Sequence, residues 1–245
     1  IGKHTVVLAH HYAYLKGKKS VGVIEDDPVN CVKTYAKPMG VVCCVTPSTN
    51  PTSTVGANCM CAFKARNAVI VAPHPGAKNC SAHAVELIRG ELKRIGAPED
   101  LLQVIEEPSP EKTRLLMSMA DVTIATGGAG MVKAAYSSGK PSFGVGQGNE
   151  QVIIDRDWTD LDKMADIVVE SRYYDLGVSC SGEQFLHIPA ERLDEVLDAL
   201  VRNGAYLVED EEIVEVKENL FTIDGTTSIE EVNELVNDGL PDGDY

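Results

Sequence analysis

Three features of the sequence could together do chemistry on a carbonyl group: a cysteine, an asparagine and a run of glycines. Cys180 lies in the segment DLGVSCSGEQ (175–184), Asn50 precedes Pro51 far upstream, and the segment 125–149 between them is rich in glycine. A thiolate adds to an aldehyde carbonyl, the resulting oxyanion needs a hydrogen-bond donor, and hydride must then leave towards an acceptor held nearby. The thiol, the side-chain amide and a nucleotide-binding turn are candidates for these three tasks.

The glycine-rich turn comes directly before a predicted helix, where backbone N–H groups can bind a phosphate. Thr126, Gly127, Gly128 and Gly130 stand at this turn, so the helix N-terminus could face the pyrophosphate of a dinucleotide. The run does not follow the G-x-G-x-x-G pattern. An ordinary tight turn between strand and helix is therefore the alternative.

The elements that must position these residues follow from the apolar pattern between 39 and 145. Short strands that are apolar throughout alternate with helices, which predicts an α/β fold with a doubly wound parallel sheet covered on both faces. An α+β sandwich would need amphipathic strands. The predicted strands are 39–45, 68–73, 101–107, 121–125 and 141–145, and the predicted helices are 52–64, 81–95, 109–119 and 129–138.

Further elements are predicted on both sides of this alternation. A helix at 5–16 and a strand pair at 21–37 precede it, and the strand pair turns at EDDPVN. A strand at 151–154, a helix at 159–170, a strand at 183–188 and a helix at 190–203 follow it.

Composition restricts the class of protein. The chain has 245 residues, of which 44% are hydrophobic and 24% charged, as in ordinary globular proteins. The net charge of −15 argues against a nucleic-acid partner. The seven cysteines lack the spacing of a zinc site, and no signal peptide or membrane span is visible. We expect a cytoplasmic protein with reduced thiols, without metal and without a membrane partner.

From Lys3 to Val208 the chain resembles the aldehyde dehydrogenase superfamily, in particular its CoA-acylating branch. That branch includes acylating sulfoacetaldehyde dehydrogenases and the front half of aldehyde-alcohol dehydrogenases. The runs that carry the resemblance are PMGVVCCVTPSTNPTSTV (38–55), ARNAVIVAPHPGAK (65–78), IEEPSPE (105–111), TGGAGMVKAAYSSGKP (126–141), GVGQGN (144–149) and GVSCSGEQ (177–184).

The resemblance implies a domain organisation that looks incomplete at both ends. Residues 1–170 would form the Rossmann-like NAD(P)-binding domain without its N-terminal part, and 171–208 the truncated start of the catalytic domain, carrying the nucleophile. The acidic tail 209–245 looks foreign. Residues 211–245 resemble the start of the transporter-associated domain of CorC/HlyC-type proteins, through IDGTTSIEEVNEL and LPDGDY.

The resemblance also assigns roles to the reactive residues. Cys180 matches the nucleophile, and the Asn50 amide would bind the oxyanion together with the Cys180 backbone N–H. A buried structural cysteine and a simple turn asparagine are the alternatives. Leu176 stands where related acylating enzymes usually carry Asn. The other six cysteines are interpreted as small core residues, and Glu183 as structural, on the opposite face of a strand from Cys180.

For the cofactor, the resemblance points to the end of the strand at 68–73. Pro73, His74 and Pro75 would lie on the adenosine side of NAD or NADP, with His74 near a ribose or a 2′-phosphate. Lys78 is a second candidate for a phosphate contact. A loop histidine and a solvated lysine are the alternatives, and the choice between NAD and NADP is open.

One absence bears on the reaction. Hydrolytic members of the superfamily carry a general-base Glu at the position of Gly144, so thiolysis by coenzyme A is the expected second step. Gln147 resembles the sulfoacetaldehyde type, and sulfoacetaldehyde or acetaldehyde is the expected substrate. The family suggests a homo-oligomer, and in this truncated chain we expect impaired oxidoreductase activity. A non-catalytic nucleotide-binding or interaction module is the alternative function.

Overall fold

The computed structural model describes residues 2–205, 214–217 and 220–222. The chain divides into two compact units, with the boundary between Gln147 and Gly148. This boundary lies before β8 (Glu150–Ile153). Residues 148–170, which were predicted to belong to the nucleotide-binding domain, therefore fall in the second unit. Among the described residues, no helix is long and apolar enough to cross a membrane.

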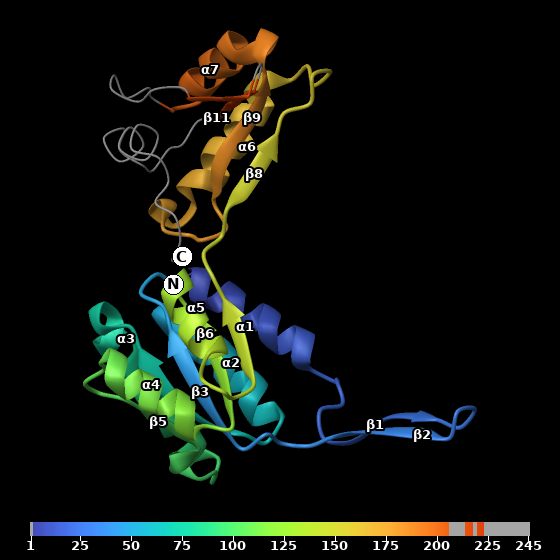
Figure 1. Ribbon diagram of the computed structural model, residues 1–245, viewed down its shortest axis with the longest axis vertical. Coiled ribbons are helices and arrows are strands. Elements are labelled where there is room, and N and C mark those ends of the chain that lie inside the picture. The colour runs from blue at the N-terminus through green and yellow to red at the C-terminus, as the bar shows by residue number, and fades with distance from the viewer. Residues whose placement is uncertain (1, 206–213, 218–219, 223–245) are drawn as a thin grey trace. The chain divides into compact units, whose positions relative to one another are not determined.

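The first unit is built on a five-stranded sheet whose order is β5-β4-β3-β6-β7. Every neighbouring pair in it is parallel, and the chain winds outward from β3 in both directions (Figure 1). The predicted doubly wound parallel sheet is therefore confirmed. The strands are β3 (Val41–Thr46), β4 (Ala68–Pro73), β5 (Leu102–Val104), β6 (Val122–Thr126) and β7 (Ser142–Val145).

Helices cover both faces of this sheet. Successive side chains of β3 point to opposite sides and pack against different helices. Val42 and Cys44 pack with residues of α2 (Pro51–Lys64) and α3 (Lys78–Arg94). On the other face, Cys43 packs with residues of α4 (Pro110–Met119) and α5 (Ala129–Tyr136). The connections carry short 3-10 turns, η1 (Pro75–Ala77) and η2 (Glu99–Leu101).

The core position of three cysteines is confirmed, and that of three others is wrong. Cys43, Cys44 and Cys59 are buried, and burial raises the pKa of the Cys43 thiol to about 12 and that of Cys44 to about 11. Such thiols are unreactive near neutral pH. The three cysteines that are exposed instead lie in a hairpin turn, on the outer side of α2 and in the first turn of α3; they are Cys31, Cys61 and Cys80.

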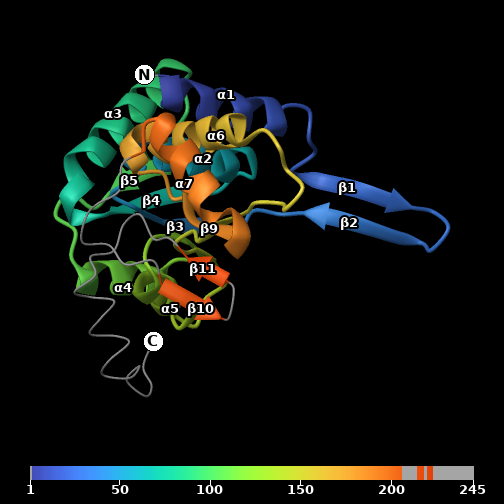
Figure 2. The same ribbon diagram turned by 90° about the horizontal axis from the view of Figure 1, so that it is seen from above.

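A helix and a hairpin precede the sheet. The helix α1 (Gly2–Leu15) packs on α2, where Leu8 lies so close to Gly56 that a β-carbon there would have no room. The strands β1 (Gly22–Asp27) and β2 (Val32–Ala36) pair in antiparallel fashion and extend away from the sheet (Figure 2). Both predicted elements are confirmed.

The second unit is a smaller sheet with the order β10-β11-β9-β8, in which β8 and β9 (Glu183–Pro189) are parallel. The helices α6 (Leu161–Tyr173) and α7 (Leu193–Arg202) share a core with these two strands. The helices predicted at 159–170 and 190–203 are thus confirmed. The turns η3 (Tyr174–Gly177) and η4 (Ala190–Arg192) begin the connections to β9 and α7. The strands β10 (Val214–Lys217) and β11 (Leu220–Thr222) lie in the predicted foreign tail, most of which falls outside the described residues.

Candidate active site

The strand order of the first unit creates a place for a ligand. The chain continues from β3 to β4 on one side and crosses over to β6 on the other, so the connections that follow β3 and β6 diverge. In open α/β sheets, ligands bind outside the carboxyl ends of the strands at such a reversal point. Pro47 follows β3, Gly127 follows β6 and His74 follows β4.

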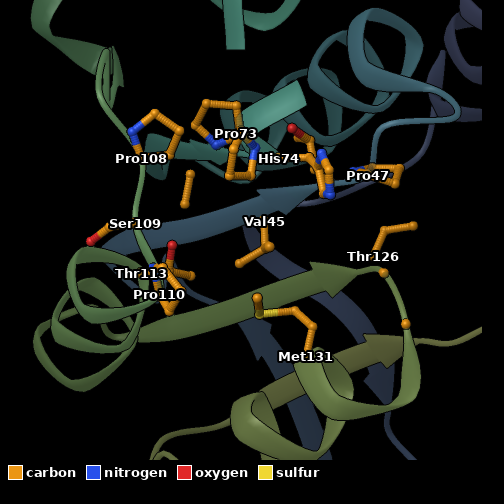
Figure 3. A pocket seen from close by; sticks show the side chains of 15 residues that line it. Val45, Pro47, Pro73, His74, Pro108, Ser109, Pro110, Thr113, Thr126 and Met131 are labelled. Carbon is orange, nitrogen blue, oxygen red and sulfur yellow. The ribbon is translucent and has the colours of Figure 1, made fainter. Parts of the chain in front are cut away.

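A pocket of about 120 Å³ occupies this edge (Figure 3). We call it the strand-end pocket. In Figure 3, Val45 lies at its centre, between His74 and Met131. Six of the eight predicted cofactor-binding residues line it, whereas Lys78 and Gly130 do not. The lining residues are Val45, Thr46, Pro47, Ala72, Pro73, His74, Pro75, Pro108, Ser109, Pro110, Thr113, Thr126, Gly127, Gly128 and Met131.

His74 is held in a fixed place at the pocket. Its Nδ1 accepts a hydrogen bond from the backbone N–H of Gly76 at 3.1 Å, which caps η1. With Nδ1 as acceptor, the neutral imidazole carries its proton on Nε2 and can donate a hydrogen bond there. The ring is exposed, so the histidine is a donor at the rim of the pocket.

Lys78 is engaged with another part of the chain. Its Nζ lies 2.6 Å from Oε2 of Glu107, and the hydrogen bond and charge of Lys78 lower the pKa of that carboxyl. Glu107 directly precedes Pro108 of the pocket lining. The predicted phosphate contact of Lys78 would therefore require exchange of this ion pair.

The glycines after β6 are not required by the fold itself. None of Gly127, Gly128 and Gly130 has a positive φ. A β-carbon at Gly128 or Gly130 would meet nothing within 4 Å, and at Gly127 it would make ordinary contact with Met131 at 3.5 Å. Glycine is favoured where a ligand approaches the backbone closely. The space at these positions suits such a ligand.

One wall of the pocket was not predicted. It comes from the connection between β5 and α4, where Ser109 accepts a hydrogen bond from the N–H of Lys112 and caps α4. Thr113, one turn into the helix, is buried. A signal for this wall existed, because the cap and the two prolines lie in the IEEPSPE run that carried the family resemblance.

Asn50 lies at the amino end of α2. It is the N-cap residue by position, yet its side chain makes no capping hydrogen bond. Its backbone carbonyl accepts from the N–H of Thr54 at 3.1 Å, and its Nδ2 lies 3.4 Å from the hydroxyl of Thr49. The turn interpretation would predict a side chain used for capping, so the amide has no such local task.

Cys180 lies in an exposed turn of the second unit. The Cys180 loop, residues 174–182, connects α6 to β9 and is closed by a hydrogen bond from the N–H of Gly182 to the carbonyl of Ser179 at 3.2 Å. A hollow of about 320 Å³ lies beside the loop. Its lining residues are Ile167, Glu170, Ser171, Tyr174, Ser179 and Ser181. Asn50 and Cys180 belong to different units.

Two neighbours of Cys180 add constraints. A β-carbon at Gly148 would collide with the carbonyl oxygen of Cys180. Glu183 is the first residue of β9 and pairs in register with Glu150, while Cys180 precedes the strand. The prediction that both lie on one strand is therefore wrong. Oε2 of Glu183 is buried and has no hydrogen-bond partner in the described part of the chain.

Gly144 lies on β7 against α5. A β-carbon there would come within 2.5 Å of Val132 Cγ1 and 2.8 Å of Tyr136 Cε2. The N–H of Gly144 also donates to the Tyr136 hydroxyl at 3.1 Å. A side chain at this position therefore requires the side chains of Val132 and Tyr136 to move.

These features can be compared with known proteins. The aldehyde dehydrogenase family matches residues 3–240. The chain belongs to this family. The match reaches into the acidic tail, whose different origin stays a prediction. An acetylating succinate-semialdehyde dehydrogenase from Clostridium kluyveri is 52% identical over 212 residues, covering 86% of this chain and 47% of that protein. A sulfoacetaldehyde dehydrogenase from Acholeplasma sp. is 49% identical over 80% of this chain and 40% of its own.

Solved structures of the family agree with this assignment. An acetylating aldehyde dehydrogenase from Geobacillus thermoglucosidasius is 40% identical, with a TM-score of 0.79 over 84% of this chain and 46% of its own. A propionaldehyde dehydrogenase from Rhodopseudomonas palustris, with bound CoA and an acylated cysteine, is 36% identical, with a TM-score of 0.67 over 71% of this chain and 40% of its own. The chain thus spans about half the length of these relatives or less.

Proposed function

We propose that the protein takes part in the NAD(P)-dependent, CoA-acylating oxidation of a small aldehyde. The observation that carries the proposal is the strand-end pocket, where six residues expected at a dinucleotide meet at the reversal point of the sheet. Relatives that include acylating enzymes support the reaction type. Cys180 is exposed in a loop bounded by glycines, which supports its proposed role as the nucleophile.

The first half-reaction would convert the aldehyde into a thioester on Cys180. The thiolate attacks the carbonyl carbon, and the amide of Asn50 together with the Cys180 backbone N–H would stabilise the oxyanion. When bound, NAD(P)+ supplies the acceptor for the hydride that leaves the same carbon. Thr126, Gly127 and Gly128 would hold its phosphates at the N-terminus of α5, and His74 would contact the ribose side.

The second half-reaction would transfer the acyl group to coenzyme A. Gly144 supplies no base for water, and a side chain at this position would first have to displace those of Val132 and Tyr136. The sulfur of the CoA thiol attacks the thioester carbonyl, and the bond to Cys180 breaks. The proton that the CoA thiol loses then protonates the Cys180 sulfur. The products are an acyl-CoA and the free enzyme thiol.

The aldehyde is proposed to be small. Sulfoacetaldehyde and acetaldehyde are the candidates from the sequence, and the name of the Clostridium kluyveri relative adds succinate semialdehyde. The hollow beside the Cys180 loop carries three serines, a tyrosine and a glutamate. A homo-oligomer, as the family suggests, is part of the proposal.

Intact-protein mass spectrometry tests the reaction. Incubation with each aldehyde and NAD+ or NADP+ should add one acyl group at Cys180, and added CoA should remove it. The variant Cys180→Ser should stay unmodified, whereas Cys80→Ser, which removes an exposed cysteine of the first unit, should react normally. Dinucleotide binding without acylation at any tested aldehyde would favour the non-catalytic module instead.

A further inference from the structure

Arg172 lies where it can control the shape of the Cys180 loop. It belongs to the last turn of α6, and its Nη1 donates a hydrogen bond to the carbonyl of Gly177 at 2.9 Å. The same nitrogen lies 3.3 Å from the β-carbon position of Gly177 and 3.5 Å from that of Gly182. One guanidinium therefore donates to Gly177 and lies beside Gly182, the glycines on the two sides of Cys180.

The loop needs such a contact because its backbone is strained. Asp175 and Leu176 have φ values of 56° and 58°, and Gly177 follows with 73°. The left-handed region costs a non-glycine residue about 1–2 kcal/mol, less for Asp than for Leu, so a contact that stabilises this conformation of the loop is needed most at Leu176. A charged donor to a backbone carbonyl is stronger than a neutral one, and Arg172 supplies it next to the strained residues.

Both glycines lie close to Arg172 in the packed loop, and the φ of 73° at Gly177 strains any residue with a side chain there. Gly182 is buried, and a β-carbon there would also lie 3.4 Å from the carbonyl of Ser179 and 3.8 Å from that of Arg172. The arginine side chain therefore lies against the loop at residues on both sides of Cys180, Gly177 and Gly182. Its conformation and the position of the guanidinium depend on each other.

We propose that Arg172 is a positioning residue for Cys180, holding the loop in the conformation that presents the thiol and the Cys180 backbone N–H to the aldehyde. The proposal rests on the proposed function. A planar guanidinium with five N–H donors suits this task. The sequence alone had not pointed to Arg172.

Arg192 offers a matched control in the same unit. Its side chain is 15% exposed, and its Nη1 donates to the backbone carbonyls of Arg156 at 2.8 Å and Trp158 at 2.6 Å. It therefore fixes a different loop, 155–158, by the same kind of contact. A merely structural arginine should behave like this one.

The experiment compares Arg172→Met, Arg172→Lys and Arg192→Met in the full chain. Single-turnover acylation of Cys180 should slow at least about tenfold in Arg172→Met, as expected for a misplaced reacting group, with the aldehyde concentration for half-maximal rate within about twofold. Arg172→Lys keeps the charge and one donor and should recover most of the rate. Hydrogen exchange should speed up in 177–182 for Arg172→Met and in 155–158 for Arg192→Met.

Two results would overturn the proposal: unchanged exchange in 177–182 in Arg172→Met, or an equal loss of acylation rate in Arg192→Met. If the wild-type chain does not acylate at all, the proposed function fails. The exchange measurement then decides separately whether Arg172 orders the loop.

Discussion

The glycines of the two units serve opposite purposes. At the strand-end pocket, Gly128 has open space where a β-carbon would lie. Beside the Cys180 loop, a β-carbon at Gly148 would collide with the backbone carbonyl of Cys180. No contact in the described part of the chain requires glycine at position 128, which suits a ligand that approaches the backbone there. Glycine at position 148 is required by the approach of the Cys180 carbonyl, so Gly148 supports the conformation of the Cys180 loop.

The largest effect is expected at Asn50, whose amide is proposed to stabilise the oxyanion. Asn50→Ala should lower the rate of Cys180 acylation about 100- to 1000-fold, the usual loss when one oxyanion donor is removed. Single-turnover mass spectrometry measures it. Because the Asn50 side chain does not cap α2, the unfolding free energy should change little. A large loss of stability would mean that Asn50 is a structural turn residue after all.

Gly148→Ala tests the crowded side of the comparison. The new methyl group would collide with the carbonyl of Cys180, and overpacking of this kind costs about 1–3 kcal/mol. Urea unfolding should show this loss, and the rate of Cys180 alkylation should change with it. Gly90→Ala, in α3 with nothing within 4 Å, is the control and should not destabilise. Equal stability of the two variants would contradict the predicted crowding.

Gly128→Ala tests the open side. The methyl group would occupy space that the protein leaves empty, so the unfolding free energy should change by less than about 1 kcal/mol, the cost of alanine at an N-cap. Dinucleotide affinity should nevertheless fall about tenfold, or about 1.4 kcal/mol. Isothermal titration calorimetry with NAD+ and NADP+ measures it. Unchanged affinity would mean that the glycines form only a tight turn.

The fold could be predicted because the strands from β3 to β6 are short, mainly apolar runs that are each followed by a helix. The ends of these strands can therefore be predicted from the sequence. The pocket residues Thr126 and His74, which lie at such ends, can be predicted with them. The exposure of Cys61 and Cys80 was missed, because a cysteine on a helix carries no sign of which face it occupies. The loop geometry at Arg172 was missed for a related reason. It depends on left-handed backbone at Asp175 and Leu176, which neither residue type announces.

Leu176 provides the smallest and sharpest test. It is 77% exposed and has a φ of 58°, so its side chain buries little while its backbone is strained. Asparagine tolerates this region better than leucine, which agrees with the Asn expected here from the family resemblance. Leu176→Asn should therefore raise the unfolding free energy by up to about 1 kcal/mol, measured by urea unfolding. Leu176→Ala keeps a β-carbon without the local hydrogen bonding of Asn and should gain nothing. An equal gain in both variants would show that removal of exposed apolar surface is the cause, and that the loop strain supporting the role of Arg172 is small.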